Sequence, residues 1–377
     1  MALRIILTTG GTGGHIFPAL AVAEALRRRH PDAELLFIGG LYGPEKELAE
    51  KAELAFVGLP VRGFIGRGLK ALSACAAMST GIGQAMRVVR AFQPHAVMGF
   101  GGYAAFAAVF AAWLLRCPCA LHEQNAIPGA ANKLLGKLVR RICLSWPQPG
   151  GNAGFPPERC VLTGNPIRSG IAALGRQERP AKEEGVLLIM GGSQGARAIN
   201  TLVVRMLPEL RAAGVRILHQ TGKNEYETVR QGYLDAGCSP EETDLMVKPF
   251  IHDMAGAYAA SRLALCRAGA TTMAELAAAG TPAIFLPFPQ AAHDHQTANA
   301  RAMEQAGGGL LLPQEKAEAL LGEGRLASLI IDLYRDSARL DAMRRGAFSL
   351  ARPEAADAVA TELLSLCPPF NATSDSL

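Results

Sequence analysis

The stretch "IILTTGGTGGHIFPALAVAEAL", residues 5–26, decides the fold. An apolar run ends in a glycine-rich turn, and a helix-like sequence begins directly after the turn, with His15 at the junction. Strand, glycine-rich turn and helix in this order are typical of the first unit of a doubly wound α/β domain, in which ligands bind beyond the carboxyl ends of the strands. The stretch therefore predicts a domain of this class at the start of the chain.

A second stretch of the same design, "LLIMGGSQGARAINTLVVRML", occupies residues 187–207. Each copy opens a series of short apolar runs of β type that alternate with helix-like sequence, which predicts a parallel sheet with helices on both faces. The expected strands are 3–8, 33–39, 95–100, 119–123 and 141–145 in the first series and 185–192, 216–222, 245–250, 262–269 and 281–289 in the second.

These two series predict two domains, because 377 residues are also too many for one ordinary core. We expect one domain at residues 1–164 and the other at 165–346, with the boundary near Asn165. A helix at about 347–366 is expected to pack back on the first domain, and residues 367–377 are expected to be a disordered tail.

The composition is that of a globular protein, with 49% hydrophobic and 19% charged residues and a mean hydropathy of +0.16. No stretch approaches the roughly 18 apolar residues that a membrane span needs, and the N-terminus lacks a signal-peptide pattern, so the chain is expected to stay in the cytoplasm. The eight scattered cysteines predict buried free thiols. Cys117, Cys119 and His122 lack the spacing of a zinc site, as do the histidines of "HDH" at 293–295, and we expect no bound metal or cofactor.

Positive charge is concentrated in one part of the chain. Residues 54–157 contain ten Lys or Arg and a single acidic residue, Glu123, whereas the net charge of the whole chain is +5. This asymmetry favours an anionic partner, the alternative being an ordinary solvated surface.

Four glycine-rich loops follow predicted strands, at 10–14, 99–102, 191–195 and 267–270. Glycine lets backbone N–H groups approach a phosphate closely, and a helix N-terminus adds favourable partial charge. Tight turns also need glycine, but four such loops in two domains indicate a site for a diphosphate. The first loop matches neither the P-loop nor the clean dinucleotide pattern, which disfavours P-loop kinase chemistry and gives little support to a nicotinamide site.

Three further groups of polar residues stand at the ends of predicted strands. Glu275, about one turn into a helix that opens at Ala270, is suited to ribose hydroxyls, or it complements the helix dipole. The run "HEQN" at 122–125 is expected to project from the sheet, with Asn125 suited to sugar hydroxyls. Arg168 is available for a diphosphate.

Taken together, the motifs resemble those of the MurG-type glycosyltransferases of peptidoglycan synthesis. The resemblance covers residues 3 to about 365 and rests on the order and spacing of "TGGTGGHIFPALAVAEAL", "GFGGY", "HEQNAIPG", "TGNPIR", "GGSQGARAIN", "RAGATTMAEL" and "HDHQTANA". It implies an α/β chain of the GT-B fold, with two Rossmann-like doubly wound domains facing across a deep cleft. It also implies transfer of N-acetylglucosamine from UDP-GlcNAc, with inversion, to the C4 hydroxyl of MurNAc in undecaprenyl-pyrophosphoryl-MurNAc-pentapeptide (lipid I), giving lipid II.

The resemblance also implies roles for individual positions. The donor would be bound by Thr12, Gly13, Gly14, Asn125, Arg168, Ser193, Ile251, Ala270, Thr271, Thr272, Met273, Ala274, Glu275 and Gln296. The acceptor side would include Gly101, Gly102, Tyr103 and Glu123. This sequence has "AAFAA" directly after Tyr103, where members of the family often carry Ser and Pro, so the local acceptor loop departs from the pattern.

His15 is the candidate catalytic base, because the neutral imidazole is favoured at a helix N-terminus. Two other roles stay open for it, a structural cap and a hydrogen-bond donor to the diphosphate.

The basic segment gains a purpose from the resemblance. An apolar patch with surrounding cations would bind an anionic membrane surface without spanning it, at the cytoplasmic face of the bacterial plasma (inner) membrane. Its residues would be Arg67, Leu69, Lys70, Leu72, Trp113, Lys137, Arg140 and Arg141; alternatively, the apolar ones are core and the cations are solvated. Other cell-wall synthesis proteins are candidate partners, and nucleic acid is not expected.

Three rival functions share parts of this pattern. A UDP-sugar transferase with another lipid or natural-product acceptor differs only in the acceptor. A UDP-GlcNAc epimerase would need no acceptor, and a non-catalytic UDP-sugar-binding protein would show no turnover.

Overall fold

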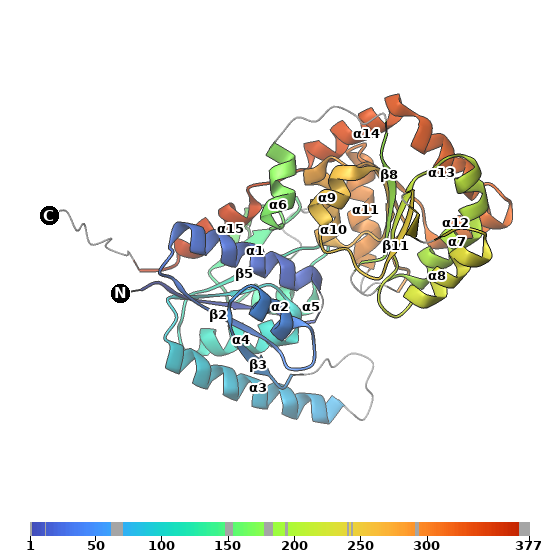
Figure 1. Cartoon of the computed structure of the whole chain (residues 1–377). Helices are drawn as coiled ribbons and strands as arrows, with labels where there is room; N and C mark the ends of the chain where they lie inside the picture. The colour runs from blue at the N-terminus through green and yellow to red at the C-terminus, as the bar shows by residue number, and fades with distance from the viewer. Residues whose placement is uncertain are drawn as a thin grey trace. The chain divides into compact units, whose positions relative to one another are not determined.

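The computed structural model describes residues 2–11, 13–61, 71–147, 154–176, 184–192, 195–239, 241–242, 244–290 and 294–368, without the side chains of 71–74 and 241–242. The chain forms two compact units (Figure 1). Unit 1 comprises Met1–Arg168 and Glu354–Leu377, and unit 2 comprises Ser169–Pro353. The division therefore lies four residues beyond the boundary expected at 164/165.

Unit 1 contains a parallel sheet in the order β3-β2-β1-β4-β5-β6-β7. Its strands are β1 (Arg4–Thr8), β2 (Glu34–Gly40), β3 (Ala55–Leu59), β4 (Ala96–Gly99), β5 (Cys119–Glu123), β6 (Arg141–Leu144) and β7 (Cys160–Leu162). Its helices are α1 (Gly13–Arg29), α2 (Glu45–Lys51), α3 (Ala71–Phe92), α4 (Gly102–Leu114), α5 (Ala130–Leu135) and α15 (Ala355–Leu364), with a short 3₁₀ turn η2 (Pro157–Arg159).

Both faces of this sheet are buried. Successive residues of a strand point to opposite faces. Accordingly, Ile5 and Leu7 of β1 pack in one apolar cluster with α1, α2 and α15, whereas Ile6 packs in another with α3, α4 and α5. The continuous apolar strands of the sequence are explained by this double burial.

Unit 2 repeats the design around a sheet of order β10-β11-β9-β8-β12-β13-β14, parallel except for the β10–β11 pair. Its strands are β8 (Val186–Met190), β9 (Ile217–Gln220), β10 (Glu241–Glu242), β11 (Leu245–Lys248), β12 (Ser261–Cys266), β13 (Ala283–Phe285) and β14 (Gly309–Leu311). Its helices are α6 (Ser169–Ala172), α7 (Arg197–Ala212), α8 (Tyr226–Asp235), α9 (Met254–Ala260), α10 (Ala270–Ala279), α11 (His295–Gln305), α12 (Gln314–Gly322), α13 (Leu326–Arg335) and α14 (Ser337–Ser349), with a 3₁₀ turn η3 (Ala173–Arg176).

The prediction of two doubly wound α/β domains is confirmed. In each sheet the chain crosses over next to the first strand of its unit, between β1 and β4 in unit 1 and between β8 and β12 in unit 2. Ligands of such sheets bind beyond the carboxyl ends of the strands at this switch point. The four glycine-rich loops follow these same four strands, so each unit presents two of them at its switch point.

The end of the chain returns to unit 1. Helix α15 lies beside α1 in Figure 1 and buries Val359, Ala360 and Leu363 against unit 1. It is shorter than the helix expected at 347–366, because residues 347–349 belong to α14 and Pro353 disfavours helical backbone at the residue before it. Most of the expected tail, residues 369–377, lies outside the described residues. No helix among the described residues is long and apolar enough to cross a membrane.

Candidate active site

The two glycine-rich loops of unit 1 pack backbone against backbone at the switch point. The Gly10 N–H donates to the Gly101 carbonyl over 3.0 Å. Gly102 has a φ of +85°, and a Cβ there would lie 2.1 Å from the Gly10 oxygen. Glycine is therefore required at position 102 both by the backbone conformation and by the close approach of the first loop.

His15 lies in the first turn of α1, beside the second loop. A Cβ at Gly101 would lie 3.1 Å from Cε1 and Nδ1 of the His15 ring, so the imidazole rests directly on the backbone of that loop. Its Nδ1 lies 3.0 Å from Oε1 of Gln124, which follows β5. Two candidate site segments and the catalytic candidate are thus brought together within unit 1, whereas Thr12 lies outside the described residues.

The run 122–125 differs from its expectation. We expected all four polar side chains to project from the sheet. His122, Glu123 and Gln124 are buried, so the expectation was wrong for these three residues. Each is hydrogen-bonded inside unit 1, which is how polar groups are accommodated in a core. Only Asn125 is partly exposed.

Glu123 organises the loop after β5. Its Oε1 accepts from the backbone N–H of Asn125 at 3.0 Å, and its Oε2 accepts from Nδ2 of Asn132 at 2.9 Å and from the Gly129 N–H at 3.2 Å. This side chain therefore holds the shape of the loop that presents Asn125.

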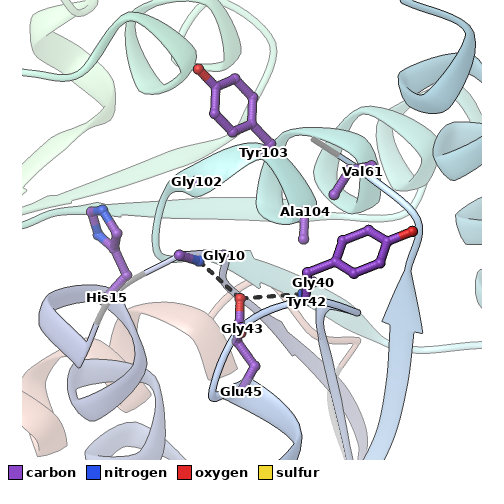
Figure 2. A pocket seen from close by; sticks show the side chains of 11 residues that line it. Gly10, His15, Gly40, Tyr42, Gly43, Glu45, Val61, Gly102, Tyr103 and Ala104 are labelled. Carbon is purple, nitrogen blue, oxygen red and sulfur yellow. Dashed lines mark hydrogen bonds between the residues drawn. The ribbon is translucent and has the colours of Figure 1, made fainter. Parts of the chain in front are cut away.

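A pocket of about 440 Å³ opens between the loops of unit 1 (Figure 2). His15 and Tyr103 flank it on one side, and Tyr42 and Val61 line another part. The remaining lining residues are Gly10, Gly11, Gly40, Gly43, Glu45, Gly102 and Ala104.

Glu45 at the base of this pocket is a site residue that the sequence analysis missed. Its side chain is buried, and Oε1 accepts from the Gly11 N–H at 2.8 Å and from the Gly40 N–H at 3.3 Å, as the dashed lines of Figure 2 mark. An internal carboxylate thus holds one of the N–H groups that we had assigned to phosphate binding. The sequence carries no signal for this contact, because Glu45 lies in an ordinary polar segment 34 residues away from Gly11.

In unit 2 the candidate donor residues gather on α10, which follows β12. Glu275 is buried in the second turn of the helix and accepts a hydrogen bond from the Tyr258 hydroxyl at 2.9 Å. Ala270, Thr271 and Met273 are buried, and Thr272 and Ala274 are partly exposed. Fewer side chains of α10 are therefore exposed than the six, at 270–275, that were predicted to bind the donor.

Two other candidate donor residues already make contacts within unit 2. The Ile251 N–H donates to Oε1 of Gln220 at 2.9 Å. The backbone contact expected between Ile251 and the donor therefore falls to the Ile251 carbonyl. Gln296, in the first turn of α11, accepts from the Phe288 N–H at 2.9 Å. Ser193 lies outside the described residues.

Arg168 ends unit 1 with its guanidinium 5.0 Å from the centre of the Phe17 ring. This cation–π contact ties it to the start of α1, which also carries Gly13, Gly14 and His15.

The described part of the expected membrane patch is mixed. Trp113 is 39% exposed and stacks on Phe110, and Lys137 and Arg140 are exposed. Arg141 instead pairs with Glu362 of α15 at 3.0 Å. Arg67, Leu69, Lys70 and the side chain of Leu72 lie outside the described residues.

The cysteines are all free, but only four of the eight are buried, and Cys75 is exposed. Burial raises the pKa of the Cys117 thiol to about 11, which keeps it protonated at neutral pH. Over the ranges that the structure describes, no three His, Cys, Asp or Glu side chains form a candidate metal site.

Comparison with known proteins places this architecture in a class. The chain matches the glycosyltransferase family 28 N-terminal domain over residues 5–144 and the family 28 C-terminal domain over residues 186–359. Two doubly wound units with glycine-rich loops at their switch points are accordingly those of a family 28 glycosyltransferase with the expected GT-B fold.

Within that class, the chain belongs to the family of UDP-N-acetylglucosamine--N-acetylmuramyl-(pentapeptide) pyrophosphoryl-undecaprenol N-acetylglucosamine transferases, the MurG family. It is 52% identical to the enzyme of that name from Nitratidesulfovibrio vulgaris (strain DSM 19637 / Miyazaki F), over 94% of this chain and 95% of the relative. The crystal structure of Acinetobacter baumannii MurG is similar at a TM-score of 0.73, with 31% identity over 96% of this chain and 99% of that one.

A UDP-GlcNAc 2-epimerase from Neisseria meningitidis shares the fold alone. Its structure, bound to UDP-GlcNAc, has a TM-score of 0.64, with 14% identity over 96% of this chain and 100% of that one. The rival epimerase function thus gains no support beyond the architecture.

Proposed function

We propose that this chain transfers N-acetylglucosamine from UDP-GlcNAc to the C4 hydroxyl of MurNAc in undecaprenyl-pyrophosphoryl-MurNAc-pentapeptide, with inversion at the anomeric carbon, to form lipid II. The observation that carries the proposal is the match to a transferase of this name over nearly the whole of both chains. The placement of two glycine-rich loops at each switch point supports it independently.

The reaction forms one C–O bond, breaks another, and moves one proton from the acceptor hydroxyl to His15. The C4 oxygen of the acceptor attacks the anomeric carbon of GlcNAc while the bond from that carbon to the diphosphate oxygen breaks, and UDP leaves with the bonding electrons. His15 takes the proton of the C4 hydroxyl as general base. N–H groups of the glycine-rich loops and Arg168 stabilise the charge that develops on UDP, without a protein-bound metal.

In this proposal unit 1 binds the acceptor and contributes Arg168 to the donor diphosphate, and unit 2 binds the rest of the donor. Unit 1 offers the acceptor side through His15, Tyr103 and the pocket of Figure 2. Unit 2 offers the donor side through Glu275 for the ribose, the Ile251 carbonyl for the uracil N3–H and the N-terminus of α10 for phosphate oxygens.

The test is transfer of radiolabelled GlcNAc from UDP-GlcNAc to a lipid I analogue, in the presence of EDTA. We expect transfer by the wild type and a loss of about 10²- to 10⁴-fold in His15→Ala, the usual contribution of a general base, with UDP-GlcNAc binding retained. His30→Ala, at the exposed position directly after α1, is the matched control and is expected to match the wild type.

Other outcomes would revise the proposal in defined ways. Equal rates in wild type and His15→Ala would keep the transferase activity but exclude His15 as its general base. Absence of transfer together with acceptor-independent conversion of UDP-GlcNAc would replace the transferase with an epimerase. Transfer only to other lipids would change the acceptor.

We further propose that unit 1 binds the anionic cytoplasmic face of the bacterial plasma membrane, where the lipid-linked acceptor resides. Trp113 and Leu114 are exposed at the end of α4, and Lys137 and Arg140 are exposed cations in the same unit. Apolar and cationic groups together are what interfacial binding requires.

Tryptophan fluorescence tests this proposal, because the chain has only Trp113 and the buried Trp146. Vesicles containing phosphatidylglycerol are expected to blue-shift the Trp113 emission and to bind less at high salt. Trp113→Ser with Lys137→Ser, which lacks the reporting tryptophan, is expected to reduce the fraction that sediments with the vesicles several-fold. Equal binding to neutral vesicles, or no blue shift, would contradict the proposal.

A further inference from the structure

A chain of hydrogen bonds leads from the His15 ring into the core of unit 1, and its direction is set by a backbone carbonyl. Nε2 of Gln124 lies 2.8 Å from the carbonyl oxygen of Phe100. A carbonyl oxygen only accepts, so the atom facing it is the amide NH₂ of Gln124. The opposite orientation of the amide would place two oxygens against each other, which fixes the assignment of Oε1 and Nε2.

This orientation determines the tautomer of His15. With the NH₂ group turned to Phe100, Oε1 of Gln124 faces Nδ1 of His15 at 3.0 Å. An amide oxygen also only accepts, so Nδ1 of His15 carries a proton and donates it. In the neutral ring the lone pair is then on Nε2.

His122 supports Gln124 from behind. Its Nε2 lies 3.0 Å from the carbonyl oxygen of Gly164 and therefore donates. Its Nδ1 is then an acceptor, at 3.1 Å from Nε2 of Gln124, so both hydrogens of the Gln124 amide have partners. Ser145 agrees with this assignment. Its hydroxyl donates to the Glu123 carbonyl at 2.8 Å, so its oxygen, 3.5 Å from Nε2 of His122, faces that N–H as an acceptor.

The support holds at neutral pH because His122 stays uncharged. The side chain is completely buried, and this burial lowers the pKa of His122 to about 4. A protonated His122 would place a hydrogen on Nδ1 against the Gln124 NH₂ group and break the chain of donors and acceptors.

We propose that Gln124 is a positioning residue which holds His15 as the Nδ1–H tautomer, so that Nε2 is the atom that receives the acceptor proton. The role rests on the proposed function, in which His15 is the base. When the C4 hydroxyl proton moves to Nε2, the Nδ1–H bond to Gln124 is unchanged, so the ring gains and loses its proton without turning. A neutral amide performs here the orienting task that a carboxylate performs in Ser-His-Asp triads.

The groups around the ring set the pH response. His122 stands behind Gln124, and Glu45, Tyr42 and Tyr103 line the same pocket. Replacing Gln124 with Glu would keep an acceptor for Nδ1 and add a negative charge, which favours the imidazolium, but it would also turn an oxygen toward the Phe100 carbonyl and lose the donor there. The acid limb of the pH profile of kcat would then shift to higher pH by about one unit.

The first measurement needs no substrate. Long-range ¹H–¹⁵N correlation spectra of the full chain with ¹⁵N-labelled histidine distinguish the two tautomers, and the His15 signals are those lost in His15→Gln. We expect the Nδ1–H tautomer in the wild type and a mixture, or the other tautomer, in Gln124→Met, which has a similar volume but only a weakly accepting thioether in place of the amide.

The second measurement is transfer kinetics. Gln124→Met is expected to lower kcat about 10- to 100-fold with an unchanged KM for UDP-GlcNAc. Gln124→Glu is expected to show the shifted acid limb at a kcat below that of the wild type. The matched control is Gln84→Met, which removes a Gln side chain that bonds a backbone carbonyl elsewhere in unit 1, that of Gly58.

Each result decides a separate point. A wild-type His15 with its proton on Nε2 would overturn the inference, as would Gln124→Met with wild-type kcat and pH profile. A loss of kcat in Gln84→Met as large as in Gln124→Met would reduce the effect to general destabilisation and overturn it as well. If the wild type transfers no GlcNAc, the proposed function fails, while the tautomer spectra still judge the role of Gln124.

Discussion

At the scale of single residues, the first glycine-rich loop is held by an internal anion. Gly11 donates its N–H to Glu45, and Gly10 donates its N–H to Gly101. A loop whose N–H groups already have partners is pre-shaped, but it offers fewer donors to a phosphate. The carboxylate of Glu45 also disfavours a phosphate close beside it, so the part of the pocket near Glu45 suits a neutral, hydrogen-bond-donating part of a substrate.

Replacing Glu45 tests this holding role. Glu45→Ala leaves two partly buried N–H groups without their acceptor and is expected to lower the free energy of unfolding by about 1–3 kcal/mol. Glu45→Gln keeps an acceptor oxygen and is expected to lose less. Urea unfolding followed by tryptophan fluorescence reports this change, because both tryptophans lie in unit 1.

The control for this prediction lies on the same helix. Glu47 is 67% exposed and pairs with Lys51, so Glu47→Ala is expected to cost well under about 1 kcal/mol. If Glu45→Ala were no more destabilising than Glu47→Ala, the contact with the glycine loop would carry no stability.

At the scale of elements, the attachment of α15 to unit 1 separates apolar packing from surface charge. Leu363 is fully buried in the apolar cluster that α15 shares with α1 and the sheet of unit 1, whereas Asp357 forms an ion pair with Arg28, whose side chain is 51% exposed. Burying a leucine contributes more than an exposed ion pair, which is screened by solvent.

We therefore expect Leu363→Ala to lower the free energy of unfolding of unit 1 by about 2–5 kcal/mol. Asp357→Ala is expected to cost at most about 1 kcal/mol and to lose that difference in high salt. Both are measured by tryptophan fluorescence during urea unfolding. A reversed order of the two variants would mean that α15 is held by charge.

Elements were predicted where the sequence carries its own signal. The ten expected strands are all present, because nine of them are apolar runs buried on both faces. The tenth, β11, buries Leu245 and Val247 on one face. Four strands were missed, and they are the edge strands of the two sheets: β3, β7, β10 and β14. Of these, β3, β7 and β14 are only partly buried, and β10 has only two residues. Periodicity and composition give a weak signal for such strands.

The site was predictable to the same extent. Glycine runs directly after buried strands located all four loops, because the chain topology alone brings them to the switch points. The contacts of Glu45, Gln124 and His122 join segments that are distant in sequence, so no local pattern predicts them. The same holds for the burial of the run 122–124, whose polarity had indicated an exposed position.

At the scale of the whole molecule, each unit has one fully buried histidine among its described residues, His122 in unit 1 and His219 in unit 2. His219 bonds Tyr233 and Asn200 in the core of unit 2. Burial lowers the pKa of His122 to about 4 and that of His219 to about 3, from an ordinary value of 6.5. The repeated design of the units therefore extends to their response to acid.

The sign of this response follows from proton binding. Below pH 6.5 the unfolded chain binds a proton at each of these positions, whereas the folded chain does not until the pH approaches the lowered pKa. The contribution of the two histidines to the free energy of unfolding is therefore fully present above pH 6.5. It falls as the pH decreases, by about 1.4 kcal/mol per pH unit for each histidine.

Unfolding at pH 7.5 and at pH 5 measures the effect in each unit. Tryptophan fluorescence isolates unit 1, where His122 is expected to account for about 2 kcal/mol of the loss at pH 5, and far-UV circular dichroism adds unit 2 with a similar loss from His219. His122→Gln is expected to be less stable at both pH values but to flatten the dependence of unit 1, while the exposed His30→Gln leaves it unchanged. A wild-type slope in His122→Gln would show that other groups, such as His95 with its own lowered pKa, govern the acid response of unit 1.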